Sequence, residues 1–204
     1  TMEHVNSGLR TFNHRVMNHA PCSIGILVDR GVWGSETLSE STISRKVAVF
    51  FFGGPDDREA LTFGRRLVEH PNISLQVVRF MPNQDQLQNH VVSIVDTDDV
   101  KLDKESLSSV KEFMGNKGKD SAQAMSYEEK HYVSPTEAVL AIAKSHDFSL
   151  ILVGRGHTTL VVESSELGVV GEALANASIE MNSSILVIQQ HKTINDSDTP
   201  KDSS

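Results

Sequence analysis

Two glycine-rich segments are the residues of this sequence whose type and spacing point to chemistry. Gly53-Gly54 ends one apolar run, and Gly154-Arg155-Gly156 ends another. Glycine lets the backbone approach a phosphate closely, so that main-chain N–H groups at a turn or helix N-terminus can bind it. Arg155 would add a positive charge. These five residues are therefore nucleotide-binding candidates, and the alternative is that the glycines only permit tight turns.

Two acidic residues argue against a bound phosphate. Asp56 and Asp57 follow Gly53-Gly54 directly, and their charge would repel an anion. As paired carboxylates they could serve acid–base chemistry. The better interpretation is that they cap a helix and fill its first turn, where negative charge is favourable.

No other pattern predicts catalysis or metal binding. The sequence has no nucleophile elbow and no P-loop after Gly53-Gly54. Its nine histidines show no metal-ligand spacing, and Cys22 is alone. We predict no catalytic residues, no metal and no enzyme activity. His157, beside Arg155 at a strand end, is the candidate for sensing pH, because histidine titrates near neutrality. A surface histidine in a loop is the alternative.

Apolar periodicity predicts the elements that must position these residues. Helices are expected over residues 3–19, 56–70, 103–115, 135–146 and 168–179. Strands are expected over residues 23–28, 46–52, 73–80, 125–133, 150–153 and 184–188. Strands and helices alternate from residue 46 onward. This order predicts an α/β fold with an open, mostly parallel five-stranded sheet and helices on both faces, plus an extra N-terminal helix and strand.

The predicted organisation has four parts. Residues 1–31 form the extra helix and strand, and residues 32–45 form a linker. Residues 46–191 form the main domain, which includes a long acidic loop over 82–102, and the polar tail 192–204 is disordered. The strand at 23–28 must join the main sheet or a partner chain, because an isolated strand leaves its backbone groups unsatisfied. The last strand, over 184–190, is expected to be a sheet edge available for pairing.

Composition restricts the class of partner. The net charge of −8 argues against nucleic-acid binding, which needs a basic face. One cysteine allows no intrachain disulfide and fits a reducing compartment. The longest apolar runs are too short to span a bilayer, so we expect this chain to be soluble.

The stretch from 46 to 191 resembles the universal stress protein fold. The similarity runs from Ser134-Pro135-Thr136-Glu137-Ala138 through Gly154-Arg155-Gly156, and continues in 166–174 and 184–190. Some members of that family bind ATP through a pattern of Gly, two residues, Gly, nine residues, Gly, then Ser or Thr. This resemblance implies that Gly168 is a further nucleotide-binding candidate.

The match to the nucleotide pattern is incomplete. Gly154 fits its first glycine, but His157 stands at the second, and Gly156 comes one residue early. Gly168 fits only with an insertion, and Val169 replaces the hydroxyl residue. We therefore expect no cofactor, with ATP or AMP as the alternative.

A narrower resemblance covers both ends and the middle of the chain. His19 through Gly31, Phe51 through Leu61, Glu166-Leu167-Gly168 and Ile185 through His191 resemble the cytosolic tail of plant cation/proton exchangers. That resemblance implies that residues 1–31 end a preceding stress-protein-like unit.

The resemblance implies a regulatory and assembly domain of a plant potassium or other monovalent cation/proton antiporter, active in cation and pH homeostasis. Its expected partners are the exchanger's own membrane domain and a second copy in a homodimer, at the cytosolic face of an endomembrane or the plasma membrane. A nucleotide-binding universal stress protein-type sensor is the alternative.

Overall fold

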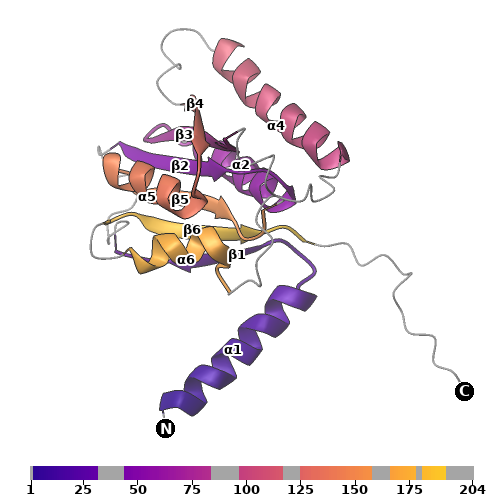
Figure 1. The fold of residues 1–204 in the computed structure, drawn as a ribbon, viewed down its shortest axis with the longest axis vertical. Coiled ribbons are helices and arrows are strands. Elements are labelled where there is room, and N and C mark those ends of the chain that lie inside the picture. Colours follow the sequence, from indigo (N-terminus) through magenta and orange to yellow (C-terminus); the bar gives the residue numbers. More distant parts are fainter. Residues whose placement is uncertain are drawn as a thin grey trace, which may run out of the picture.

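A computed structural model describes residues 2–31, 44–83, 97–116, 125–157, 166–177 and 181–191. Most of the predicted linker, the middle of the acidic loop and the tail lie outside the described residues. The described part of the chain forms a six-stranded sheet in the order β1-β6-β5-β2-β3-β4 (Figure 1). The strands are β1 Ile24–Val28, β2 Arg45–Phe51, β3 Ile73–Pro82, β4 Met125–Tyr132, β5 Leu150–Gly154 and β6 Ser184–Gln189.

The predicted fold class is confirmed by this sheet. Strands β2 to β6 run parallel to their neighbours, and β1 pairs antiparallel with β6. The N-terminal strand was expected to join either the main sheet or a partner chain. It joins the main sheet. The prediction that residues 184–190 form a sheet edge is wrong, because β1 covers the outer side of β6. The edges of the described sheet are β1 and β4.

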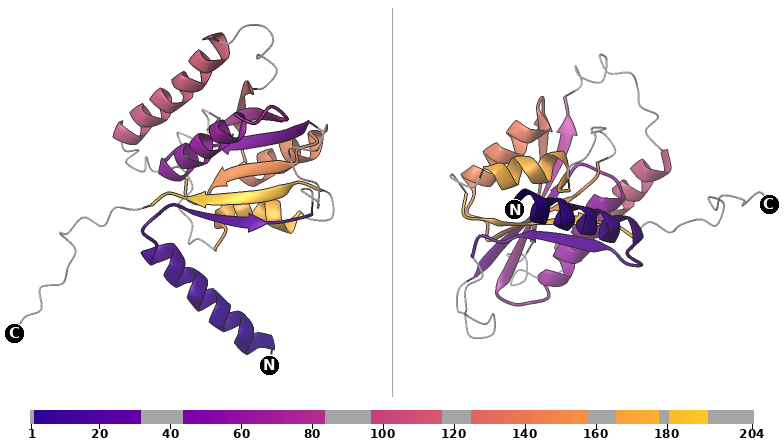
Figure 2. Two further views of the ribbon diagram at one scale, coloured as in Figure 1. Left: turned by 180° about the vertical axis from the view of Figure 1, so that it is seen from behind. Right: turned by 90° about the horizontal axis from the view of Figure 1, so that it is seen from below.

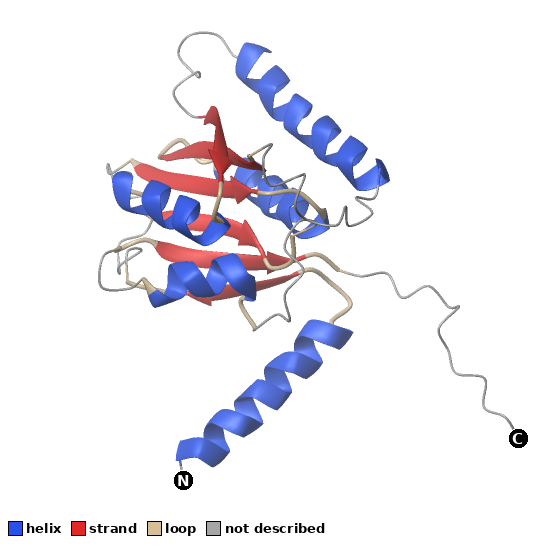
Figure 3. Ribbon diagram, viewed as in Figure 1, coloured by secondary structure: helices blue, strands red, loops and turns tan. Residues whose placement is uncertain are grey.

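Helices cover both faces of the sheet (Figures 2 and 3). The described helices are α1 Met2–His19, α2 Pro55–Leu67, α4 Thr97–Asn116, α5 Pro135–Ser145 and α6 Gly168–Asn176. The side chains of β2 alternate between two cores. Ala48 and Phe50 pack in the core under α5 and α6, whereas Val47 and Val49 pack in the core under α2 and α4.

Local signals explain where α5 begins. The Ser134 hydroxyl accepts a hydrogen bond from the Glu137 N–H at 3.4 Å, and Pro135 stands at the first helical position. The predicted cap of α2 is wrong. Gly54 occupies its N-cap, and Asp56 and Asp57 are buried in contacts to other elements.

The acidic loop predicted over 82–102 is also partly wrong. Strand β3 extends to Pro82, and α4 begins at Thr97, six residues earlier than expected. Val100 and Leu102 are exposed there, so the first turn lacks the buried apolar side chains on which the prediction relied. What holds this turn in place is an ion pair between α4 and α2.

Candidate functional site

The glycine turns predicted to bind a phosphate do meet at one place. They follow β2 and β5, which are neighbouring parallel strands, and the chain passes to opposite sides of the sheet from them. Gly53 and Gly54 have φ angles of 118° and 104°, which favour glycine. A Cβ at Gly154 would lie 2.5 Å from Asp57 Oδ1, so this position also requires glycine.

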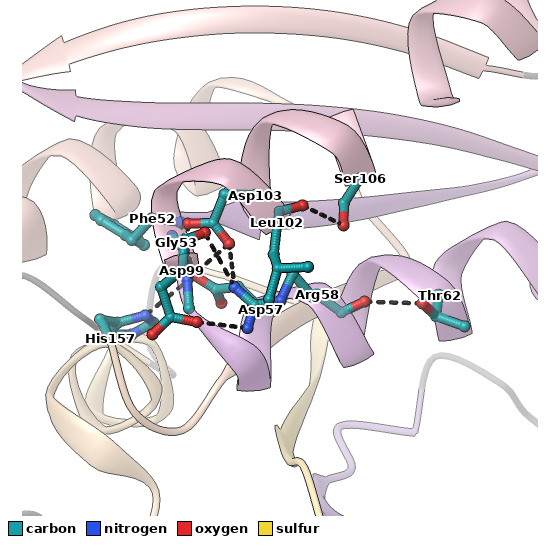
Figure 4. Close-up of polar contacts among 11 residues, drawn as sticks. Phe52, Gly53, Asp57, Arg58, Thr62, Asp99, Leu102, Asp103, Ser106 and His157 are labelled. Atoms are coloured by element: carbon teal, nitrogen blue, oxygen red, sulfur yellow. Dashed lines mark hydrogen bonds and ion pairs between the residues drawn. The ribbon is translucent and has the colours of Figure 1, made fainter. Parts of the chain in front are cut away.

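The side chain that fills this meeting point is Asp57. It is fully buried, and its Oδ2 accepts hydrogen bonds from the N–H groups of Phe52 and Gly53 at 2.7 and 2.9 Å. Its Oδ1 accepts from the Gly154 N–H at 2.8 Å. The carboxylate therefore lies between the ends of β2 and β5 and accepts from donors of both. Figure 4 shows Asp57 beside Phe52 and Gly53.

The neighbouring carboxylate, Asp56, joins two more segments. Its Oδ2 accepts from the Gly156 N–H and its Oδ1 from the Gln190 N–H, each at 2.8 Å. The end of β5 is thereby connected to the end of β6. Asp56 and Asp57 together satisfy donors at the ends of three strands.

A third carboxylate comes from α4. Both oxygens of Asp103 lie 3.1 Å from the Gly54 nitrogen and accept its N–H. Arg58 on α2 pairs with Asp103 at 2.5 Å and with Asp99 at 2.6 Å (Figure 4). Burial alone lowers the pKa of Arg58, but its hydrogen bonds and attraction to these two aspartates outweigh burial and raise that pKa.

The contacts of Asp99, Asp103 and Arg58 were not predicted from the sequence. Asp99 and Asp103 are four residues apart and share one face of α4. A spacing of four residues indicates a shared helix face only where the segment is helical. Residue 99 lay in the predicted loop, so the spacing could not be used.

The pH-sensing candidate, His157, is buried rather than exposed in a surface loop. Its side chain is 2% exposed, and Nδ1 lies 3.2 Å from Asp57 Oδ2. The centroids of the His157 and Phe52 rings are 4.9 Å apart. Nε2 is buried and has no hydrogen-bond partner among the described residues. The histidine therefore belongs to the same site as the three carboxylates, which we name the carboxyl-edge cluster.

The remaining candidates, Arg155 and Gly168, contact each other instead of the other glycines. The Arg155 Nε donates to the Glu166 carbonyl at 3.1 Å, and its Nη1 donates to Gln189 Oε1 at 3.2 Å. Gly168 has a φ of 70° and lies directly against the Arg155 carbonyl. A pocket of about 80 Å³ borders Arg155. This is small beside the roughly 300–1,000 Å³ of typical ligand sites.

The chemistry of the carboxyl-edge cluster follows from these contacts. The N–H groups of Gly53, Gly54, Gly154 and Gly156 all donate to aspartate carboxylates. Such groups would otherwise be free to bind an anion. A phosphate at these donors would have to displace buried negative charges that are already hydrogen-bonded.

Arg30 forms a second polar site that the sequence analysis did not identify. It follows β1, and its guanidinium donates to the carbonyls of Leu174 and Ala175 near the end of α6, and to those of Met181 and Ser183. These distances are 2.9 to 3.3 Å. Burial lowers the pKa of Arg30. Arg30 therefore binds the segment after β1 to the end of α6 and to the residues before β6.

The described residues contain neither a candidate metal cluster nor a candidate membrane-spanning helix. No group of three or more His, Cys, Asp or Glu side chains there could hold a metal ion. No helix within the same ranges is long and apolar enough to cross a membrane.

Comparison with solved structures finds universal stress proteins. One is universal stress protein UspA from Lactobacillus plantarum, with 14% identity, a TM-score of 0.44, and 73% of this chain and 100% of that chain covered. Another is a universal stress protein family member from Burkholderia pseudomallei, with 15% identity, a TM-score of 0.45, and 72% and 97% covered.

Comparison with curated proteins finds plant transporters. Cation/H(+) antiporter 20 and cation/H(+) antiporter 15 of Arabidopsis thaliana are 35% and 36% identical to this chain and cover 93% of it. Cation/H(+) antiporter 18 of the same plant is 37% identical over 94% of the chain. The chain spans about a quarter of the length of each of these relatives.

Two family models divide the chain between them. Residues 1–32 match the model described as plant cation/H(+) antiporter domain. Residues 44–189 match the plant cation/H(+) antiporter, C-terminal domain. The resemblance derived from the sequence is confirmed, and the chain belongs to the plant cation/H(+) antiporter family.

Proposed function

We propose that this chain is a non-catalytic regulatory and assembly domain, which lies at the cytosolic face of a membrane and adjusts the activity of a potassium or other monovalent cation/proton antiporter. Its immediate partner would be the membrane domain of the same exchanger. Through that contact it would contribute to cation and pH homeostasis.

The observation that carries this proposal is the extent of the match. Antiporter 20 aligns along 93% of this chain, but the aligned region is only 25% of that relative. The chain corresponds to a limited part of a transporter and matches its C-terminal domain over residues 44–189. A part of this kind acts on the rest of the transporter through contact.

The carboxyl-edge cluster supports a non-catalytic role. Parallel α/β sheets bind ligands outside the carboxyl ends of their strands. Here Asp56 and Asp57 of α2 accept from donors at the ends of β2, β5 and β6, and Asp103 joins α4 to Gly54 after β2. The carboxylates of the cluster hold elements together, because each accepts hydrogen bonds from buried or half-buried main-chain N–H groups.

The test uses antiporter 20 in three forms: intact, without the region aligned to this chain, and with that region replaced by this chain. The exchange rate would be measured in vesicles over a range of pH. We expect truncation to change the rate or its pH dependence by about fivefold or more, as is typical of coupled sites. We expect this chain to restore it. If truncation leaves rate, pH dependence and membrane abundance unchanged, the regulatory role is wrong.

A nucleotide sensor is the second candidate, because the glycine turns do meet at the switch point of the sheet. Binding would require Asp57 and Asp103 to leave their donors. Calorimetry with ATP, AMP, cyclic nucleotides and potassium tests this, and our proposal expects no binding at micromolar concentration. Micromolar ATP binding that Arg155→Ala abolishes would replace the proposal with a nucleotide sensor.

His157 remains the candidate for sensing pH. Its Nε2 is buried without a partner among the described residues, and its Nδ1 lies against Asp57, so its ring is part of the carboxyl-edge cluster. His157→Gln should alter the pH dependence of exchange, whereas His191→Gln, at an exposed position, should not. Equal pH profiles for both variants and the unaltered chain would exclude this role.

Homodimerisation also remains a prediction, but the strand edge expected to form the dimer is already paired within the chain. Strand β6 was the edge proposed for pairing, and β1 now occupies it. A homodimer would have to form through another surface. Sedimentation of the purified chain over a range of concentrations would test it.

A further inference from the structure

The pairing of β1 with β6 has a local twofold symmetry. Each strand contains the sequence Ile-Leu-Val, at 26–28 and at 185–187, and each follows a helix, α1 or α6. Leu27 pairs with Leu186. Ile26 pairs with Val187, and Val28 pairs with Ile185. Equivalent residues therefore exchange partners across the axis, which is the signature of an isologous contact between two like units.

One side of this axis is complete and the other is not. Leu186 is half-buried and packs against the core under α2. Its symmetry mate, Leu27, is 54% exposed. The twofold therefore relates a covered leucine to an uncovered one.

The helices show the same difference. In α6, Val170 and Leu174 are fully buried in the core over the sheet. Its counterpart α1 extends away from the sheet beyond β1 (Figures 1 and 2). Phe12 is 65% exposed and Val16 is 38% exposed, although both belong to an apolar stripe at helical spacing. An apolar helix face of this kind is stable when it packs against another element.

Strand β1 also presents an unpaired side. It is an end strand of the described sheet and pairs only with β6. Proteins seldom leave such an edge open, because its N–H and C=O groups bind further strands. By the twofold, the next strand would lie parallel to β1, as β5 lies parallel to β6.

The N-terminal flank, defined as α1 and β1, is nevertheless fixed to this domain. Arg30 binds four carbonyls around the end of α6 and the start of β6. The Ser184 hydroxyl accepts from the Arg30 N–H and donates to Asp29, each at 3.1 Å. The flank is therefore bound to this domain through polar contacts as well as through the pairing of β1 with β6.

We propose that the N-terminal flank completes a second α/β unit, and that both units share one continuous sheet across the Leu27–Leu186 axis. The occupant of the uncovered face is the rest of that second unit, supplied by the segment immediately upstream of the aligned region in full-length relatives. Two findings identify it: residues 1–32 match a separate domain model of the family, and the relatives are about four times as long as this chain.

This arrangement specifies the assembly part of the proposed function, but it is tested without measuring transport. Antiporter 20 carrying this chain in place of its aligned region would be purified in detergent and compared with the chain alone by hydrogen–deuterium exchange. We expect amides of residues 11–28 to exchange at least about tenfold more slowly in the chimera, and amides around Val133 to be unchanged. Equal exchange of residues 11–28 in both proteins would overturn the proposal.

Two variants check the surface itself. Phe12→Glu and Leu27→Glu should abolish the added protection in the chimera. In the chain alone they should shift the urea midpoint no more than Val133→Glu, a control at a 63% exposed position. Protection that survives both variants would overturn the proposal. So would concentration-dependent protection in the chain alone, because a second copy would then be the occupant.

Discussion

The carboxyl-edge cluster and the N-terminal flank both contact β6, the cluster at its carboxyl end and β1 of the flank along its length. They differ in how far the described residues satisfy their hydrogen-bonding groups and cover their apolar side chains. At the cluster, every glycine N–H named above has an aspartate acceptor. At the flank, Phe12 and Leu27 are more than half exposed, and β1 pairs on one side only within the described sheet. The carboxyl-edge cluster, where a ligand was expected, is therefore filled by the chain's own aspartates. The N-terminal flank, which was expected to be only an addition to the domain, leaves apolar side chains and a strand edge uncovered.

The two regions differ in what their groups contribute to, which is stability at the cluster and association at the flank. Buried carboxylates with hydrogen-bond donors on every side stabilise a fold and are costly to disrupt. An uncovered strand edge and apolar helix face instead gain free energy when another body binds. Substitutions at the cluster should therefore change stability, and those at the flank should change association.

The largest effect is expected for Asp57→Ala. It leaves the N–H groups of Phe52, Gly53 and Gly154 buried without acceptors, and should lower the free energy of unfolding by about 3–5 kcal/mol. Urea denaturation measures this. Asp147→Ala, at an exposed position, is the matched control and should have little effect. Similar midpoints for both variants would show that the cluster is not the stabilising centre described here.

Arg30→Ala should have the next largest effect, because it acts on the joint between flank and domain. Loss of its four hydrogen bonds to carbonyls should cost about 2 kcal/mol. Hydrogen exchange should speed up in β1 and β6 more than in β2 and β3. Arg15→Ala, on the exposed part of α1, is the control. Uniform acceleration across the sheet would contradict local opening.

Asp103→Asn should have a smaller effect, because it weakens one of several contacts between α4 and α2. The amide keeps an oxygen for the Gly54 N–H but removes a charge opposite Arg58, at a cost of about 1–2 kcal/mol. Urea denaturation of Asp103→Asn, of Asp99→Asn and of the double variant would measure the coupling. Strict additivity would show that the two aspartates do not act together.

The smallest effect is expected for Tyr127, which lies on β4, the edge strand opposite β1. It concerns how the stability of the domain depends on pH. Burial, and then a hydrogen bond to Glu129, raise the pKa of Tyr127 to about 12. An unfolded tyrosine titrates near ~10, so this contribution to stability is complete below about pH 10 and is lost as the pH rises toward 12. Unfolding at pH 8 and 11 should show a smaller alkaline loss for Tyr127→Phe than for the unaltered chain. Equal losses would exclude the contribution.

The sequence by itself determined the elements and their class. Alternating apolar runs, the Ser134-Pro135 start signal and the breaks at glycine are local features, and local features set where α5 and the central strands form. They also placed Gly53, Gly54, Gly154 and Gly156 at strand ends. Short-range physics was sufficient for each of these.

Only the tertiary structure decided what those glycines bind. Asp57 and Gly154 are 97 residues apart, and Asp103 and Gly54 are 49 apart, so no local pattern shows that carboxylates would fill the turns. The burial of His157 and the covering of β6 by β1 follow from contacts over similar distances. A sequence states which groups are available, but their partners depend on how distant segments pack, because hydrogen bonding and burial are properties of the folded neighbourhood.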